Sequence, residues 1–204
     1  GYVPQDHFET APDAGFEPAT HMVLAPRTFL YSDTDLKSPR SGYRSMGSKL
    51  RICGQQTTRG TEYAIVEGGH AIIANHLIQI GNWMPDPVSI AETLLHTPYL
   101  WGGNSAFGVD CSGLVSLANL LCGKRVLRDS DMQAQTIGEE IPLESDKLRR
   151  GDLVFWKGHV GLMTDDSTLL HANGHSMSVA LESLADAITR IGYLYGQPTR
   201  IRRP

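Results

Sequence analysis

The stretch Asp110-Cys111-Ser112-Gly113 is the strongest candidate for chemistry in this chain. It lies between a glycine-rich segment, 101–108, and an apolar run from Leu114 to Leu121. The spacing of the apolar residues predicts a helix that buries one face. Asp110 is a good N-cap, so Cys111 falls in the first turn, where free N–H groups and the helix dipole favour a thiolate. The pattern indicates a cysteine nucleophile, although a small buried side chain is the simpler interpretation of any single cysteine.

A cysteine nucleophile needs a base for its proton and a third group that orients the base. His159 and His171 can supply both roles, because they lie in two predicted strands joined by a tight turn at 164–167. A register that pairs 159 with 171 puts the two side chains on one face, whereas pairing 160 with 171 separates them. We predict the former, because the catalytic interpretation requires it. A metal site of His159, His171 and Asp152 is a weaker alternative without a supporting ligand spacing, and we predict no metal and no cofactor.

Composition excludes several classes of partner. The chain has 204 residues, 41% of them hydrophobic and 20% charged, which is typical of folded globular proteins. A net charge of −4 without a basic stripe argues against nucleic acid. Cys53, Cys111 and Cys122 contain no C-x-x-C pair, so neither a disulfide framework nor a zinc site is expected. No apolar stretch approaches the length of a membrane span, so we expect no membrane partner; the oligomeric state stays open, with a monomer as the simplest case.

The first third of the chain is predicted to be a small barrel. Short β-like runs, such as 28–31, 62–66 and 71–74, alternate with turn residues between His21 and Ile80. Their order resembles a bacterial SH3 domain, and a strand extension of one single domain is the alternative. The predicted organisation is an extended lead-in at 1–20, an SH3-like domain at 21–80, a proline-containing linker at 81–87 and a second domain at 88–204.

The second domain is predicted to place helices before strands. A short helix follows the cap Asp86 and runs to Leu95, and another occupies about 128–137 after the Cys111 helix. Strands are expected at 151–156, 159–163 and 168–172, followed by a helix from Leu181 to Ile188 and a polar tail. This order predicts an α+β fold in which the helices lie on one side of an antiparallel sheet.

Six short motifs of the second domain resemble, in order and spacing, the NlpC family of papain-like cysteine peptidases. They are Thr97–Gly103, Asp110–Leu114, Arg128–Ser130, Arg150–Phe155, Gly158–Leu162 and Leu170–Ala172. The resemblance covers roughly residues 88 to 195, and an N-terminal bacterial SH3 domain is a common companion in that family. It implies a papain-like fold and hydrolysis of the γ-D-glutamyl bond to meso-diaminopimelate, or to lysine, in peptides derived from peptidoglycan.

The resemblance also implies a role for individual residues. Carried over by position, Cys111 is the nucleophile, His159 the base and later the acid, and His171 the orienting group. Tyr99, together with the backbone N–H of Cys111, would stabilise the oxyanion. Asp110 and Ser112 match the residues that bind the ammonium of a free N-terminal L-Ala in some family members. A carboxylate can accept hydrogen bonds from helix N–H groups and from an ammonium together, so capping by Asp110 does not exclude this role.

Related two-domain enzymes close the site with acidic and aromatic side chains of the SH3 domain. Glu62, Tyr63 and Tyr43 are the candidates here, and packing within the barrel is the alternative for each. Such closure would restrict the substrate to trimmed peptides with a free L-Ala end, which indicates cell-wall recycling. Since no signal peptide is recognisable, we expect a cytoplasmic protein; a periplasmic or secreted one is the alternative if a signal peptide was removed.

Two other functions remain open on the sequence alone. One is a catalytically idle wall-binding protein in which SH3 recognition is the function. The other is an amidase or acyltransferase, because these enzymes share the thioester intermediate of a cysteine peptidase and differ in the acceptor. We further expect Arg128 to pair with a nearby carboxylate, and Trp101 and Trp156 to lie either in a substrate groove or in the core.

Overall fold

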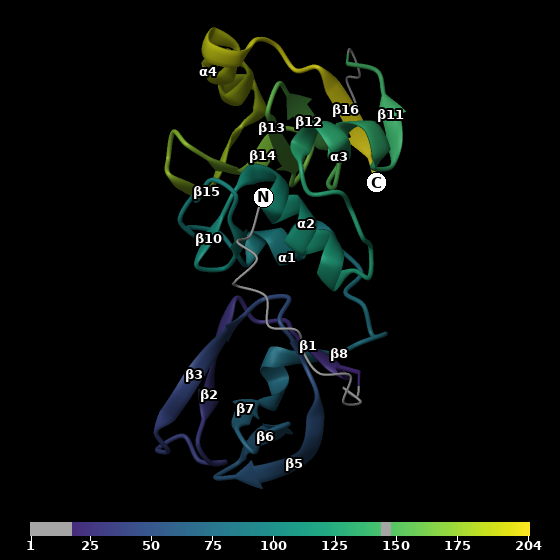
Figure 1. Cartoon of the computed structure of the whole chain (residues 1–204). Coiled ribbons are helices and arrows are strands. Elements are labelled where there is room, and N and C mark those ends of the chain that lie inside the picture. The colour runs from purple at the N-terminus through teal and green to yellow at the C-terminus, as the bar shows by residue number, and fades with distance from the viewer. Residues whose placement is uncertain (1–17, 144–147) are drawn as a thin grey trace, which may run out of the picture.

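The computed structural model describes residues 18–143 and 148–204 of the chain. Most of the predicted lead-in, 1–20, therefore lies outside the described residues. A smaller N-terminal region of strands, 18–80, is followed by a larger C-terminal region, 87–204, that contains the four α-helices (Figure 1).

The described residues 18–80 form eight strands in two antiparallel sheets, with the orders β4-β1-β8 and β3-β2-β7-β6-β5. Their bounds are β1 (His21–Val23), β2 (Arg27–Tyr31), β3 (Arg40–Ser45), β4 (Lys49–Leu50), β5 (Ile52–Thr58), β6 (Thr61–Val66), β7 (Ala71–Ile73) and β8 (Leu77–Gln79), with a 3-10 helix η2 (Ala74–His76) between the last two. Leu30, Val66 and Ile72 belong to the small core between the sheets. The short strands separated by turns that the sequence predicts are observed. The identification of this region as an SH3 domain stays a prediction.

The C-terminal region is built on a six-stranded antiparallel sheet with the order β11-β16-β12-β13-β14-β15. Its strands are β11 (Glu139–Ile141), β12 (Leu153–Trp156), β13 (His159–Met163), β14 (Thr168–Asn173), β15 (Ser178–Ser183) and β16 (Arg200–Arg203), and a small hairpin of β9 (Asn104–Ser105) and β10 (Gly108–Val109) precedes them. The helices are α1 (Pro87–Glu92), α2 (Cys111–Leu121), α3 (Ser130–Thr136) and α4 (Leu184–Tyr195). The predicted mixture of helices and an antiparallel sheet is therefore observed.

Helices cover both faces of this sheet. Strand residues alternate in direction, so Val160 and Leu162 face the core shared with α1 and α2, while Met163 and Leu169 face α4. Figure 1 shows α4 on the side of the sheet opposite α1 and α2. The prediction that all helices lie on one side is therefore wrong, because the apolar stripe of α4 covers the second face.

The predicted helix from Leu181 to Ile188 begins too early. Leu181 lies in β15 at the edge of the sheet, where its side chain is exposed although Val179, on the same face, is buried. The helix α4 starts at Leu184, after the Ser183 hydroxyl accepts a hydrogen bond from the Asp186 N–H at 3.2 Å. At the other end of the region, α1 stops at Glu92 rather than at Leu95.

The predicted polar tail is an interior strand of the sheet, β16. Its sequence, Arg-Ile-Arg-Arg, hides this role because its charged side chains find partners in the fold. The guanidinium of Arg202 donates to the carbonyl oxygens of Ile137 at 2.8 Å and Gly138 at 2.9 Å. Arg203 pairs with the buried Asp152 at 2.7 Å. Charge alone therefore gave the wrong prediction for this segment.

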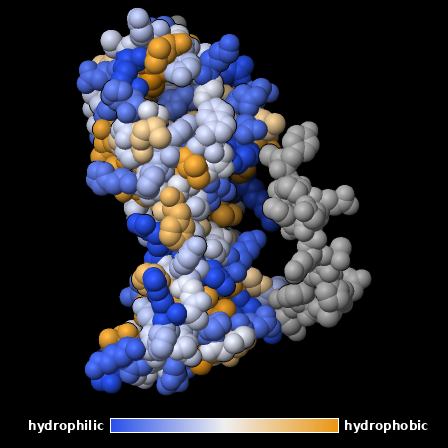
Figure 2. Space-filling view, turned by 60° about the vertical axis from the view of Figure 1, so that its left-hand side comes forward, coloured by the Kyte–Doolittle hydropathy of each residue, from blue (hydrophilic) through white to orange (hydrophobic). Residues whose placement is uncertain are grey.

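A continuous core joins the two regions. Met22 and Met46 of the N-terminal region belong to the same buried cluster as α1 and α2. The Ser45 hydroxyl accepts a hydrogen bond of 2.8 Å from the N–H of Ala106, in the loop that leads to Cys111. Helices α1 and α2 lie between the sheet and the N-terminal strands in Figure 1, and the face in Figure 2 carries hydrophobic residues scattered among hydrophilic ones. The N-terminal region is therefore packed directly beneath the helix that starts at Cys111.

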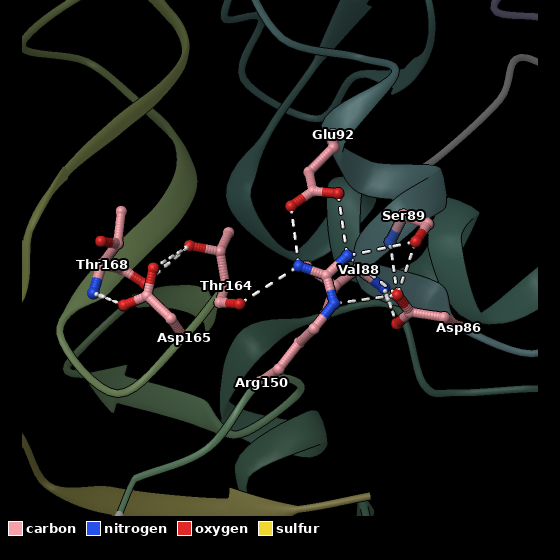
Figure 3. Close-up of polar contacts among 8 residues, drawn as sticks. All are labelled: Asp86, Val88, Ser89, Glu92, Arg150, Thr164, Asp165 and Thr168. Atoms are coloured by element: carbon pink, nitrogen blue, oxygen red, sulfur yellow. Dashed lines mark hydrogen bonds and ion pairs between the residues drawn. The ribbon is translucent and has the colours of Figure 1, made fainter.

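Arg150 fastens α1 to the turn that follows β13. Its guanidinium donates two hydrogen bonds of 2.8 Å to Glu92 and one of 3.1 Å to the carbonyl of Thr164 (Figure 3). It also donates to Asp86, at 2.8 Å and 3.0 Å, while Asp86 caps α1 through the N–H groups of Val88 and Ser89. This cluster lies at the end of β13 remote from His159, so we assign it to stability.

Candidate active site

The start of α2 places Cys111 at the point where the glycine-rich loop meets the sheet. Asp110 is the N-cap and accepts a hydrogen bond of 2.7 Å from the N–H of Gly113. The loop and the helix approach too closely for larger residues. A Cβ on Gly113 would lie 2.3 Å from the carbonyl oxygen of Gly103. Glycine at these positions therefore allows the first turn of α2 to seat against the loop.

The electrostatics of Cys111 differ from the expectation. The side chain is 7% exposed, and this burial raises the pKa of the thiol. The charge of Asp110 raises it further, while hydrogen bonds from the backbone N–H groups of Val160 and Ser112 lower it in part. The prediction that the helix start favours a thiolate is wrong for the resting protein, because burial and Asp110 outweigh the backbone dipoles. The Val160 N–H thus lies near enough to the thiol to lower its pKa, which places the thiol next to the start of β13.

His159 and His171 contact each other directly. Nε2 of His159 lies 2.8 Å from Nδ1 of His171, with 5.0 Å between the ring centroids. The register pairs Leu162 with Leu170 and Met163 with Leu169, so His171 stands opposite Gly161 rather than opposite His159. The two histidines are diagonal neighbours on one face. The prediction of a shared face is confirmed, and the predicted pairing of 159 with 171 is wrong by two residues, because His171 stands opposite Gly161.

Both imidazoles are neutral near pH 7. Burial lowers the pKa of His159 to about 3, helped by the charges of His171 and Arg190 and opposed by Glu182. Burial and the charge of Arg190 lower the pKa of His171 to about 3 as well. The Cys111 thiol, whose pKa the Val160 N–H affects, is thus neutral near the residue that precedes Val160, and that residue, His159, is a neutral ring that can accept a proton.

Sequence reasoning missed two residues behind the histidines. Oε1 of Glu182, in β15, lies 2.7 Å from Nε2 of His171, although off the direction of a straight hydrogen bond. Arg190 of α4 in turn forms an ion pair with Glu182. Glu182 pairs with Leu169 across the sheet, two positions from His171 on the same face. Because 181–188 was predicted as a helix, Glu182 was not expected beside His171, whereas a strand prediction with period two would have placed it there.

A groove of about 630 Å³ opens beside His159. Its lining includes Tyr99, Trp101, Lys157, His159, His175 and Arg190. Trp101 is 83% exposed there, whereas Trp156 is buried against the α4 side of the sheet. Of the two tryptophans, Trp101 lies in the groove and Trp156 lies in the core.

Tyr99 lies close enough to Cys111 for their charges to interact. Burial raises the pKa of the Tyr99 phenol, and the negative charges of Cys111 and Asp110 raise it further. The phenol therefore keeps its proton and can donate a hydrogen bond. This position is compatible with the oxyanion role that was predicted for Tyr99.

Arg128 holds the residues on both sides of Cys111. Its guanidinium donates to the two carboxylate oxygens of Asp110, at 3.0 Å and 2.8 Å, and to the Ser112 hydroxyl at 2.8 Å. The expectation that Arg128 pairs with a nearby carboxylate is confirmed. Asp110 and Ser112 are 8% and 5% exposed, so an ammonium could reach them only beside Arg128. Their role in substrate binding stays a prediction.

Of the three N-terminal candidates, Tyr43 contacts the C-terminal region. Its ring centroid lies 4.9 Å from that of Phe107, in the glycine-rich loop. Tyr63 is fully buried and packs edge-on against Tyr31, which is the barrel-packing alternative. Glu62 is exposed in β6, where it pairs with Thr57 of β5. Closure of the site by the N-terminal region stays a prediction.

The described residues contain no group of three or more His, Cys, Asp or Glu side chains placed to hold a metal ion. Asp152, the third member of the alternative metal site, is instead bound to Arg203 and to the backbone N–H of Arg149. None of the helices in 18–143 and 148–204 is both long and apolar enough to cross a membrane.

Comparison with known proteins gives consistent matches. Residues 96–193 match the profile of the NlpC/P60 family. Dipeptidyl-peptidase 6 of Lysinibacillus sphaericus is 35% identical over 137 residues, which are 62% of this chain and 50% of that protein. The gamma-D-glutamyl-L-lysine dipeptidyl-peptidase of Bacillus subtilis is 35% identical over 111 residues, 50% of this chain and 36% of that protein. The chain thus spans about half of the first relative and about a third of the second.

A solved structure is similar over both regions. The crystal structure of an NlpC/P60 family protein from Bacillus cereus has a TM-score of 0.71 at 25% identity, and the match covers 91% of this chain and 63% of that one. Together these matches show that residues 96–193 are similar to NlpC/P60 domains and that the fold of both regions is similar to that of a solved member of the family.

Proposed function

Taking residues 96–193 as an NlpC/P60 domain, we propose that the chain is a cysteine peptidase acting on peptides derived from peptidoglycan. The bond cleaved is the γ-D-glutamyl bond to meso-diaminopimelate or lysine. The observation that carries the proposal is the contact of 2.8 Å between His159 and His171, one residue from the Val160 N–H that reaches the Cys111 thiol. Relatives named gamma-D-glutamyl-L-lysine dipeptidyl-peptidase support the class of bond.

The first half of the proposed reaction forms a thioester. Sγ of Cys111 attacks the γ-carbonyl carbon while the thiol proton passes to His159, and the carbonyl oxygen becomes an oxyanion. The backbone N–H of Cys111 and the Tyr99 hydroxyl donate to that oxygen; losing one such donor typically costs about 3 kcal/mol. The C–N bond then breaks, and the leaving amine takes the proton from His159.

The second half returns the enzyme to its starting state. Water attacks the thioester carbon and gives one proton to His159. The C–S bond breaks, the peptide leaves with a free γ-carboxyl group, and the proton on His159 returns to the Cys111 sulfur. Because thiol and imidazole are both neutral at rest, proton transfer accompanies the attack instead of preceding it.

The proposal includes recognition of a free N-terminal L-Ala by Asp110 and Ser112. Arg128 already binds both residues, so the ammonium must share the carboxylate with a second cation. A strict demand for a free amine would make trimmed peptides the substrate, and the proposed place of action is then the cytoplasm.

The test compares L-Ala-γ-D-Glu-meso-diaminopimelate with its N-acetylated form, with products read by mass spectrometry. Release of diaminopimelate from the free form alone supports the whole proposal. Equal cleavage of both would support the peptidase activity and contradict the recognition of a free ammonium. No cleavage of either would contradict the peptidase activity and favour the wall-binding alternative. Transfer of the acyl group to an added amine in place of water would favour the acyltransferase alternative.

Two matched variants assign the nucleophile. Cys111→Ala is expected to abolish turnover, because no other thiol lies at the site. Cys122→Ala, at the end of the same helix, is expected to keep wild-type turnover. Activity that survives in the Cys111 variant would show that the nucleophile is wrongly assigned.

A further inference from the structure

A chain of side chains runs from His159 through the buried His171 and then Glu182 to Arg190, which lines the same groove as His159. Nε2 of His159 lies 2.8 Å from Nδ1 of His171, and Nε2 of His171 lies 2.7 Å from Oε1 of Glu182. Arg190 closes the chain by pairing with Glu182. His171 is completely buried, so its two ring nitrogens depend on these protein partners alone.

The carboxylate decides which nitrogen of His171 carries a proton. An ionised carboxylate is only an acceptor. If Nε2 of His171 were bare, its lone pair would face a negatively charged oxygen at 2.7 Å, which is repulsive whatever the angle of approach. Nε2 therefore carries the proton. Because the ring is neutral, Nδ1 is bare and accepts a hydrogen bond.

The same reasoning extends one ring further. A bare Nδ1 on His171 requires a donor at 2.8 Å, and the atom at that distance is Nε2 of His159. His159 is neutral and carries one proton, so its own Nδ1 is bare. That nitrogen is the one left to take the proton of Cys111.

Arg190 controls the charge of the pair. An uncompensated Glu182 would favour a doubly protonated His171, whose Nδ1–H could no longer accept from His159. Arg190 offsets the carboxylate, and its charge lowers the pKa of both histidines. The charges that act on the pKa of the two rings come from Glu182 in β15, Arg190 in α4 and the rings themselves, and Lys157 and His175 line the groove beside His159.

We propose that Glu182 and Arg190 are positioning residues that hold His159 and His171 as neutral Nε2–H tautomers, leaving Nδ1 of His159 as the base. Their importance for catalysis rests on the peptidase function proposed above. The tautomers themselves are a property of the resting protein, so they are measurable whether or not the proposed substrate is cleaved.

The direct test is ¹⁵N NMR of the imidazoles in full-length protein at pH 7, using two-bond correlations between ring carbon-bound protons and nitrogens. The expected wild-type spectrum has Nε2 protonated and Nδ1 bare in both rings. Glu182→Gln is expected to mix the tautomers of His171. A wild-type His171 protonated at Nδ1 would overturn the proposal, and this needs no variant to fold.

The matched control is Glu140→Gln. Glu140 lies in β11, at the opposite edge of the same sheet, and also pairs with an arginine, Arg202. This substitution is expected to leave the tautomers and the kinetics unchanged. Equal spectra for Glu182→Gln and wild type would contradict the proposed role of the carboxylate.

Kinetics give a second readout on the same variants. Glu182→Gln is expected to lower kcat by about 100-fold with little change in KM, because the base is misoriented and not removed. Glu182→Asp should recover part of kcat. Arg190→Gln is expected to move the acid limb of the pH profile of kcat to higher pH, because His171 then protonates more easily. The inference would be contradicted if kcat were unchanged in Glu182→Gln and the acid limb of the pH profile of kcat were unshifted in Arg190→Gln.

Discussion

Two aspartates cap helices of the C-terminal region in the same way, and each binds an arginine from a distant part of the chain. Asp110 caps α2 and pairs with Arg128 at 2.8 Å, while Asp86 caps α1 and pairs with Arg150 at 2.8 Å. In both cases one carboxylate satisfies free helix N–H groups and a guanidinium at once. The local device is therefore the same at both helix starts.

What differs is the surroundings. Asp110 precedes Cys111 and is 8% exposed, so its charge acts on the thiol with little screening. The Asp86 side chain is 35% exposed, and Arg150 shares its charge with a second carboxylate, Glu92. Water screens the charges of Asp86 and Arg150, and Glu92 competes with Asp86 for the guanidinium, so the attraction between Asp86 and Arg150 is weaker. The comparison shows that a capped Asp–Arg pair serves the chemistry of the site only where it is buried beside a reacting group.

Breaking the pair at the active site should have the largest effect. Asp110→Asn is expected to lower kcat/KM by about 100-fold, because the guanidinium of Arg128 then has no carboxylate partner beside the nucleophile. The pKa of Cys111 should fall at the same time, since Asp110 raises it. Alkylation by iodoacetamide at pH 7 should then be faster while turnover is slower. Slower alkylation together with full turnover would contradict this account of Asp110.

The histidine pair at the active site and the remote Asp86 should also differ in their response to acid. His159 and His171 have folded pKa values of about 3, far below the ordinary value of 6.5, so the unfolded chain binds more protons between these limits. Their contribution to stability is complete above pH 6.5 and is lost as the pH falls towards 3. The pKa of Asp86 is lowered from 3.8, so its contribution is lost only below that value.

The measurement is urea unfolding at several pH values between 7 and 4. The free energy of unfolding of the wild type should fall by roughly 3 kcal/mol for each of the two rings between pH 6.5 and 4, since one pKa unit corresponds to about 1.4 kcal/mol. His159→Gln should flatten this slope, whereas Asp86→Asn should leave it unchanged. A wild-type curve that is flat between pH 6.5 and 4 would contradict the neutral, buried pair.

Removing the arginine at the remote pair should affect stability alone. Arg150→Ala loses the contacts with Glu92, Asp86 and the Thr164 carbonyl, so we expect a loss of about 1–2 kcal/mol in urea unfolding. Turnover should stay within about twofold of wild type, because the cluster lies at the far end of β13. A large loss of kcat with normal stability would erase the distinction between the two pairs.

The smallest expected effect is that of Asp86→Asn. Asparagine caps a helix about as well as aspartate, so only the exposed ion pair with Arg150 is lost, about 0.5 kcal/mol. Raising the salt concentration to 1 M should shrink the difference from wild type. A loss above about 2 kcal/mol would mean that this exposed pair behaves like the buried one.

The sequence predicted those parts of the fold that depend on local signals. The caps Asp86 and Asp110 set the starts of α1 and α2. The shared face of His159 and His171 was predicted because the catalytic interpretation requires it, since the strand period alone allows either face. Local signals failed where a tertiary partner decides the outcome. The arginines of β16 look like a solvent-exposed tail until their buried acceptors are known.

The same limit applies to the candidate site. The pKa of Cys111 could not be predicted from its place in the helix, because burial by the sheet opposes the helix dipole. Glu182 was missed because its strand was taken for a helix, which removed it from His171. Contacts between segments far apart in the chain therefore account for what sequence reasoning left out.

The most direct test of the central claim uses a substrate-shaped alkylating reagent, the diazomethyl ketone of L-Ala-γ-D-Glu. Peptide mapping after reaction identifies which of Cys53, Cys111 and Cys122 is labelled. The account predicts that Cys111 alone is labelled, that L-Ala-γ-D-Glu-meso-diaminopimelate slows the labelling, and that His159→Gln slows it by at least about 100-fold. Labelling of another cysteine, or labelling of Cys111 at an unchanged rate in His159→Gln, would contradict it.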